Sequence, residues 1–192
     1  MKKVSVFKKE SSYIRDVNIR KDLRKLISLL PDYFFEIPAS LSGKYHPSFA
    51  LGEGGLVRHT KATVRIAYEL LNNEITGSRF TDRDKDLIIM ALVLHDGLKC
   101  GIEKDKHTSF DHPLQMSKFI LMNREKLSLG IDDIRKVCSM IESHMGQWTI
   151  DPETNKEILP KPRTEEQRFI HMCDFLASKK FIDIKFVDGD II

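Results

Sequence analysis

The stretch Leu87-Ile-Ile-Met-Ala-Leu-Val-Leu-His-Asp96 decides the fold. Its first eight residues are apolar without a break, and the polar lead before it offers Thr81 or Asp82 as a helix N-cap. A buried strand can also carry an unbroken apolar run, but the polar lead and the total length favour a helix that is apolar on every side. We therefore expect a buried central helix over residues 82–96 that ends near Gly97.

Helical periodicity continues on both sides of this segment. Apolar residues at spacings of three and four predict further helices over residues 15–30, 56–73, 110–127, 131–146 and 164–180. The pattern predicts an all-α bundle of about six or more helices. Alternating apolar residues near both ends, Val4 and Val6 against Ile182, Ile184 and Phe186, would also allow the ends to pair as a short terminal β-ribbon.

These elements suggest three parts. Residues 1–55 hold an N-terminal helix that Pro31 stops, followed by an irregular lead-in rich in proline and glycine, which we expect to pack on the core. Residues 56–180 form the helical domain, and residues 181–192 form a C-terminal tail.

Composition excludes several classes of protein. The 31 basic and 28 acidic side chains give a net charge of +3, which is too small to mark a nucleic-acid-binding surface. Three scattered cysteines without a Cys-x-x-Cys pair predict neither disulfides nor a thiolate metal site. The longest apolar run is far below the roughly 20 residues of a membrane span, and the N-terminus has no signal-peptide core. We expect a cytoplasmic protein without a membrane partner. Serine-hydrolase, Walker-loop and zinc-deaminase motifs are absent from the sequence.

Four histidines and two aspartates fall on core-facing stripes near helix ends. They are His59, His95, Asp96, His112, His144 and Asp174. A single histidine on an apolar face is ordinarily a satisfied core residue, but an unpaired buried carboxylate costs several kcal/mol. A divalent metal would satisfy all six together, because neutral imidazoles and carboxylates are its natural ligands. The lack of cysteine among them argues against a closed structural zinc site.

His95 and Asp96 pose a geometric condition. Consecutive residues of a helix point about 100° apart, so both can face one site only if the metal lies between their directions or if the helix ends there. Gly97 makes such an ending plausible.

The order of these residues resembles a known family. The motifs are Gly54-Gly-Leu-Val-Arg-His59-Thr60, Leu94-His-Asp-Gly-Leu-Lys99, Asp111-His112-Pro-Leu, Glu142-Ser-His144-Met-Gly146 and Ile170-His-Met-Cys-Asp174-Phe-Leu-Ala177. They resemble the HD-domain superfamily of metal-dependent phosphohydrolases, and most closely the HD domain of YhaM-type 3′-to-5′ exoribonucleases.

The resemblance implies roles for the six residues. His59, His95, Asp96 and Asp174 would bind a first divalent metal, with His112 and His144 as ligands of a second and Asp96 bridging. The cofactor would be one or two ions of manganese, iron, nickel, cobalt or zinc. Asp96 and Lys99 are the candidate catalytic residues, with Lys99 matching the basic residue by which the family contacts phosphate.

Further residues are candidates for substrate binding. They are Lys99, His46, Trp148, Arg58 and His171. Trp148 would stack a base at the rim or cap the core, and His171 would support the site from behind or pack within its helix. Arg58 would approach the mouth of the site, whereas Lys61 and Arg65, on another face of that helix, are expected to be solvated.

Three functions remain open at this stage. The first is a metal-dependent phosphohydrolase acting on a nucleotide or a short single-stranded nucleic acid. The second is a module that binds a nucleotide or signal molecule without turnover. The third, a helical adaptor, leaves the buried carboxylates unexplained.

Overall fold

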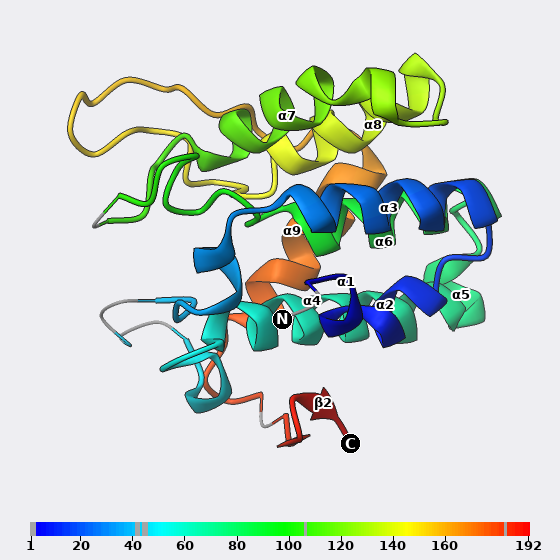
Figure 1. The fold of residues 1–192 in the computed structure, drawn as a ribbon, viewed down its shortest axis with the longest axis horizontal. Helices are drawn as coiled ribbons and strands as arrows, with labels where there is room; N and C mark the ends of the chain where they lie inside the picture. The colour runs from blue at the N-terminus through cyan, green and yellow to red at the C-terminus, as the bar shows by residue number, and fades with distance from the viewer. Residues whose placement is uncertain (1–2, 41–42, 44–45, 106, 183) are drawn as a thin grey trace.

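The computed structural model describes residues 3–40, 43, 46–105, 107–182 and 184–192 (Figure 1). Within these residues the α-helices are α1 (Lys3–Val6), α2 (Lys8–Ser12), α3 (Val17–Leu29), α4 (Gly55–Asn72), α5 (Glu74–Gly77), α6 (Asp82–Leu94), α7 (His112–Met122), α8 (Ile131–Glu142) and α9 (Glu165–Ala177). Short 3₁₀ turns lie at η1 (Asp32–Phe35), η2 (Ser48–Ala50) and η3 (Arg124–Lys126). The strands are β1 (Phe186–Val187) and β2 (Asp190–Ile191). The all-α expectation is therefore confirmed.

Helix α6 is the centre of the fold. It begins with a capping box in which the Thr81 hydroxyl accepts from the Asp84 backbone N–H and the Asp84 carboxylate accepts from the Thr81 backbone N–H. Every residue from Asp86 to Leu94 is buried, because α2, α3, α4, α8 and α9 all pack against this helix. The helix is apolar on all sides because it has no solvent face.

Four of the other long helices form two packed pairs, and α3 packs on α6 separately. α4 lies on α9, and α7 lies on α8, as Figure 1 shows. The boundaries predicted from periodicity hold within a few residues, except at the C-terminal end of the segment predicted over 110–127. There α7 stops at Met122 and is followed by η3.

The N-terminal lead-in shares this core. Phe7, Ile14 and Phe34 are fully buried in the same apolar cluster as α6. The buried carboxylate of Asp86 accepts the backbone N–H groups of Arg15 and Asp16 at 2.9 and 2.7 Å, which ties the start of α3 to α6. These N-terminal residues thus share the apolar cluster of the helical core. The division of the chain into residues 1–55, 56–180 and 181–192 stays a prediction.

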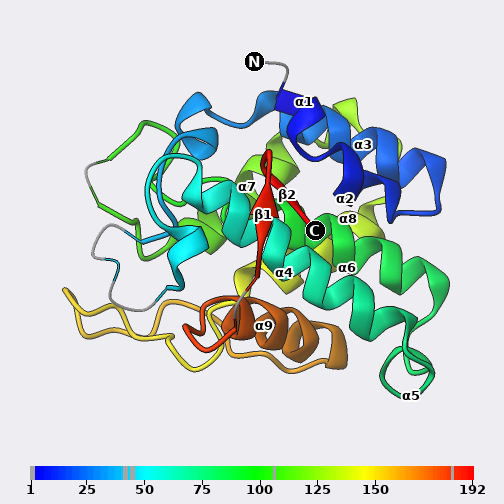
Figure 2. The same ribbon diagram turned by 90° about the horizontal axis from the view of Figure 1, so that it is seen from below.

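The predicted ribbon between the two chain ends is wrong. Residues Lys3–Val6 are helical, and β1 pairs antiparallel with β2 within the tail, with Phe186 opposite Ile191. Figure 2 shows this hairpin crossing over α4. The expectation that Lys61 is solvated is also wrong. The hairpin covers this side chain, and its ammonium pairs with Asp190 at 2.7 Å.

None of the helices in the described residues combines the length and apolar character that a membrane crossing requires.

Candidate metal centre

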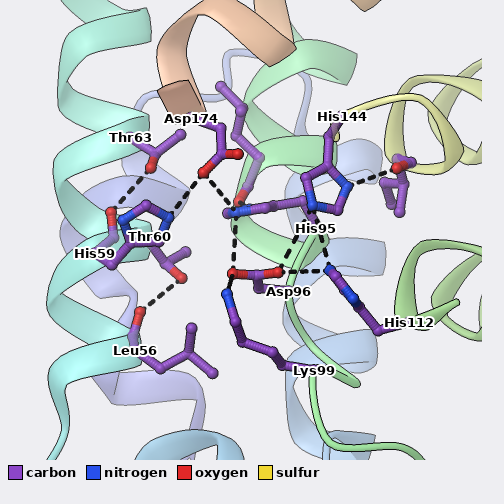
Figure 3. A network of polar contacts seen from close by, with 12 residues as sticks. Leu56, His59, Thr60, Thr63, His95, Asp96, Lys99, His112, His144 and Asp174 are labelled. Atoms are coloured by element: carbon purple, nitrogen blue, oxygen red, sulfur yellow. Dashed lines mark hydrogen bonds and ion pairs between the residues drawn. The ribbon is translucent and has the colours of Figure 1, made fainter. Parts of the chain in front are cut away.

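The six side chains that the sequence singled out converge at one place in the bundle. Figure 3 shows His59 and Asp174 on one side, His112 and His144 on the other, and His95 and Asp96 between them. The His59 Nε2 atom lies 2.8 Å from Asp174 Oδ1. The His95 Nε2 atom lies 3.5 Å from both Asp174 Oδ1 and Asp96 Oδ2, so it links the two sides.

Five elements bring these side chains together. His59 comes from α4 and Asp174 from α9, while His112 is the first residue of α7 and His144 follows the end of α8. α6 ends at Leu94, so His95 and Asp96 leave the helix as it terminates and both reach the site. Gly97 allows this ending, because a Cβ there would lie 2.8 Å from Leu30 and 2.9 Å from Met116.

Three of the histidines have the same local hydrogen bond. Each Nδ1 atom lies close to the carbonyl oxygen of the residue three positions earlier. The distances are 2.7 Å from His95 to Leu92, 2.7 Å from His112 to Ser109, and 2.8 Å from His144 to Ile141. A carbonyl only accepts, so each Nδ1 carries a proton, and whenever the ring is neutral its Nε2 holds a lone pair. That is the tautomer in which an imidazole binds a metal through Nε2.

In the neutral rings these lone pairs face one another. The Nε2 atoms of His112 and His144 are 3.4 Å apart, and Asp96 Oδ1 lies 3.0 Å from the first and 3.7 Å from the second. His95 Nε2 and Asp96 Oδ1 are buried and make no hydrogen bond. Such a set of converging acceptors is unfavourable by itself, and a cation resolves it.

The charges of the site favour a cation as well. Burial opposes ionisation of Asp96, but Lys99, His95 and His112 overcome it and hold its pKa well below the ordinary range. For Asp174, burial is likewise overcome by His59 and His95, and its pKa is lowered. Burial lowers the pKa of His144 to about 3, with His95 and His112 adding to the effect, so this ring stays neutral. Two carboxylates and neutral imidazoles are the ligands expected for a divalent transition metal.

Among the described residues, two sets of three side chains offer ligand atoms that lie within 4.8 Å of one another. One is His59, His95 and Asp174, and the other is His95, Asp96 and His144. His112 borders the second set through its contact with Asp96. The residues therefore fit one or two divalent ions. Asp96 faces His95 with one carboxylate oxygen and His112 and His144 with the other.

Comparison with known families agrees with this geometry. The sequence model of the HD domain matches residues 56–178, which is most of the chain. The chain belongs to the HD domain family. HD domains generally are metal-dependent hydrolases that bind divalent metals. No curated protein and no solved structure gives a significant match.

The centre of this HD domain forms the floor of a cavity of about 560 Å³. Asp96, Lys99, His112, His144 and Asp174 all line it. The Lys99 ammonium pairs with Asp96 Oδ2 at 2.5 Å, and its side chain is 13% exposed. A positive group thus stands beside the ligands at the edge of an open space.

Of the candidate substrate residues, His46 and Trp148 also line this cavity. The His46 ring lies edge-on to His59 with 5.1 Å between ring centroids. Burial and the neighbouring His59 lower the pKa of His46 to about 4. Trp148 is 46% exposed and so lies at the rim rather than in the core.

The remaining two candidates have supporting positions. His171 donates from Nδ1 to the His144 carbonyl at 2.8 Å and packs against Trp148. Arg58 does not line the cavity: its guanidinium donates to the carbonyls of Phe49, Leu51 and Glu53, and so braces the turn before α4.

Sequence reasoning missed Phe175, which lines the same cavity beside Trp148. Its signal was its spacing of four residues from the candidate His171 on α9, because residues four apart share a helix face and these two rings are in contact.

Proposed function

We propose that this HD domain is a phosphohydrolase that uses divalent metal to cleave phosphate esters of a nucleotide or a short single-stranded nucleic acid. The observation that carries the proposal is the position of Asp96. Its two carboxylate oxygens face different histidines, and Lys99 stands beside it at the floor of an open cavity.

Two groups of side chains would each hold one metal ion. His59, His95 and Asp174 would hold one ion, and Asp96, His112 and His144 would hold a second. A divalent ion supplies Lewis acidity, which lowers the pKa of water toward neutrality and offsets negative charge on phosphoryl oxygens. The backbone carbonyls that hold Nδ1 of three histidines fix the ring orientations before any metal arrives.

Lys99 would bind the phosphate of the substrate. Among the described residues that line the cavity, Lys99 is the only lysine or arginine. Once metal charge offsets Asp96, this ammonium is available to contact a phosphoryl oxygen at the same place. The resemblance to the HD domain of exoribonucleases supports a nucleotide or nucleic acid as the rest of the substrate.

The test combines metal content with hydrolysis. Purified protein is analysed for bound metal and assayed with bis-p-nitrophenyl phosphate and a nucleotide panel, each with manganese, nickel, cobalt or zinc. We expect bound metal and hydrolysis in the wild type. Asp96→Asn should lose hydrolysis and the ion held with His112 and His144. Asp132→Asn, which changes an exposed carboxylate on α8 away from the cavity, is the matched control and should behave as wild type.

Two results would refute the proposal. One is the absence of hydrolysis with every ion, which together with tight nucleotide binding would favour the binding module. The other is hydrolysis that survives Asp96→Asn, because the activity would then come from elsewhere.

A further inference from the structure

Two aromatic rings, Trp148 and Phe175, form a wall on one side of the cavity, and the His171 ring packs against both. The Trp148 and Phe175 rings are nearly parallel, with centroids 6.1 Å apart and planes at 23°. The His171 ring lies 6.1 Å from Trp148 and 5.9 Å from Phe175. Trp148 is 46% exposed and Phe175 is 36% exposed, and both line the cavity that holds Asp96 and Asp174. The Lys179 ammonium lies 3.5 Å from the Phe175 ring centroid, so Trp148 is the more open of the two rings and is available to stack on a flat ligand.

The wall is built rigidly onto the metal centre. Trp148 follows His144 by four residues, and Phe175 follows Asp174 directly. His171 joins them, since its Nδ1 donates to the His144 carbonyl. Gly146 has a φ of +67° and lies so close to His171 that a Cβ would come within 2.1 Å of its ring. The turn at Gly146 therefore brings Trp148 back over His171 at a fixed place relative to the ligands.

The wall fits a flat aromatic group whose phosphate reaches the floor. Exposed aromatic side chains bind nucleobases by stacking, and each base contributes substantially to affinity. Lys99 lies at the floor of the same space. A cavity of about 560 Å³ has the size of an ordinary small-molecule site.

The charges around the cavity argue against a long polyanion. The cavity adjoins a second one of about 600 Å³, with which it shares His107, Thr108, His112 and Met145. The charged lysine, arginine, aspartate and glutamate side chains that line this second cavity, among the described residues, are all acidic: Asp105, Asp111, Asp151 and Glu153. Proteins that bind a nucleic-acid strand line its path with basic side chains instead.

We propose that Trp148 and Phe175 form a base-binding subsite and that the substrate is a mononucleotide with one phosphate at Lys99. This inference rests on the proposed function. In the reaction, the bond between phosphorus and the nucleoside oxygen breaks. Water provides the oxygen that phosphorus gains and the proton that the leaving nucleoside oxygen takes, so the products are a nucleoside and inorganic phosphate.

Trp148 is the only tryptophan of the chain, so its fluorescence reports on this subsite alone. The zinc-loaded protein is titrated with adenosine 5′-monophosphate, adenosine, ribose 5-phosphate and oligodeoxyadenylate. Adenosine 5′-monophosphate and adenosine should quench the emission, and ribose 5-phosphate should not. Turnover does not disturb the signal, because the product keeps its base.

Steady-state kinetics give the second measurement. Trp148→Ala should raise the KM for adenosine 5′-monophosphate by about 5- to 150-fold, the loss expected for one stacked base. The KM for ribose 5-phosphate should stay unchanged, and Trp148→Phe should restore most of the loss. Phe181→Ala, which removes an aromatic ring that is 80% exposed outside the cavity, is the matched control and should change neither KM.

The outcomes separate this inference from the proposed function. Hydrolysis without quenching, or an equal effect of Trp148→Ala on both substrates, overturns the base subsite and leaves the phosphohydrolase intact. Quenching without hydrolysis of any ester supports the subsite and refutes the phosphohydrolase. Tighter binding of oligodeoxyadenylate than of adenosine 5′-monophosphate overturns the assignment of a mononucleotide.

Discussion

Replacing His144 by asparagine should remove the stabilisation that metal gives the fold. The asparagine amide occupies the place of Nδ1 and can keep the hydrogen bond to the Ile141 carbonyl, but nothing then occupies the place of Nε2. The variant thus deletes a ligand atom while sparing the local turn. Because His144 is 1% exposed, some packing is lost as well, and the shift caused by metal is therefore the quantity to compare.

The expected size follows from binding linkage. A divalent ion at a free concentration about 100 times its Kd stabilises the folded state by about 2.7 kcal/mol. For a chain of this size each kcal/mol raises Tm by about 2–4 °C, so the wild type should gain about 5–11 °C. If losing the ligand weakens binding about 100-fold, the same ion concentration leaves only about 0.4 kcal/mol, or about 1–2 °C.

The assay is thermal unfolding by circular dichroism, first with a chelator and then with manganese, nickel or zinc. His107→Asn is the matched control, because His107 is an exposed histidine of the same cavity that belongs to neither ligand set. It should keep the full shift. A wild type whose Tm no divalent ion raises, or a His144→Asn variant with an undiminished shift, would refute the assignment of the metal centre.

Two further predictions concern stability away from the metal. Lys136→Met should lower the free energy of unfolding by about 1 kcal/mol at pH 7, since it removes partly exposed ion pairs to Asp84 and Glu166 that join α8 to α6 and α9. Burial opposes ionisation of both carboxyls, yet Lys136 holds each pKa below its ordinary value, so the stabilisation is complete above about pH 5 and fades as pH falls through the lowered pKa values. Gly146→Ala should cost about 2–3 kcal/mol in urea unfolding, because alanine is strained at this φ and must displace His171 from its hydrogen bond.

Each has a result that would contradict it. For Lys136→Met, a stability difference that is as large at pH 3 as at pH 7 would show that the carboxyls are not its cause. For Gly146→Ala, the control is Gly130→Ala, at a glycine with negative φ and no atom within 4 Å of the added Cβ. Equal losses in the two variants would mean that close packing at Gly146 is not responsible.

The sequence predicted the helices and the six inward side chains because both depend on short-range periodicity. An unbroken apolar run identified α6 as central, since only a helix covered on all sides can be apolar all round. Burying an unpaired carboxylate such as Asp96 is costly, whereas burying a leucine is not. The two buried aspartates therefore indicated that the six side chains share a metal site.

What the sequence could not supply depends on contacts between distant segments. Lys61 lies on the outer side of α4 by periodicity, and only the fold of the tail, more than a hundred residues later, buries it against Asp190. Arg58 has the charge of a phosphate ligand, but three carbonyls of the preceding turn occupy its guanidinium. Phe175 joins the cavity wall because Trp148 arrives from another element.

Three of the candidate metal ligands are histidines that lie at helix ends and hydrogen-bond to nearby backbone carbonyls. His95 at the end of α6 and His144 after α8 each donate from Nδ1 to the carbonyl three residues back, Leu92 and Ile141; the Ile141 carbonyl also accepts the His144 backbone N–H. The same bond decides which ring nitrogen keeps its lone pair and aims it at Asp96. His112 repeats the arrangement at the start of α7, with its backbone N–H and Nδ1 both directed to the Ser109 carbonyl. A helix end thus fixes both the position and the tautomer of three of the four histidines, whereas Nδ1 of His59, in the body of α4, is buried without a hydrogen-bond partner.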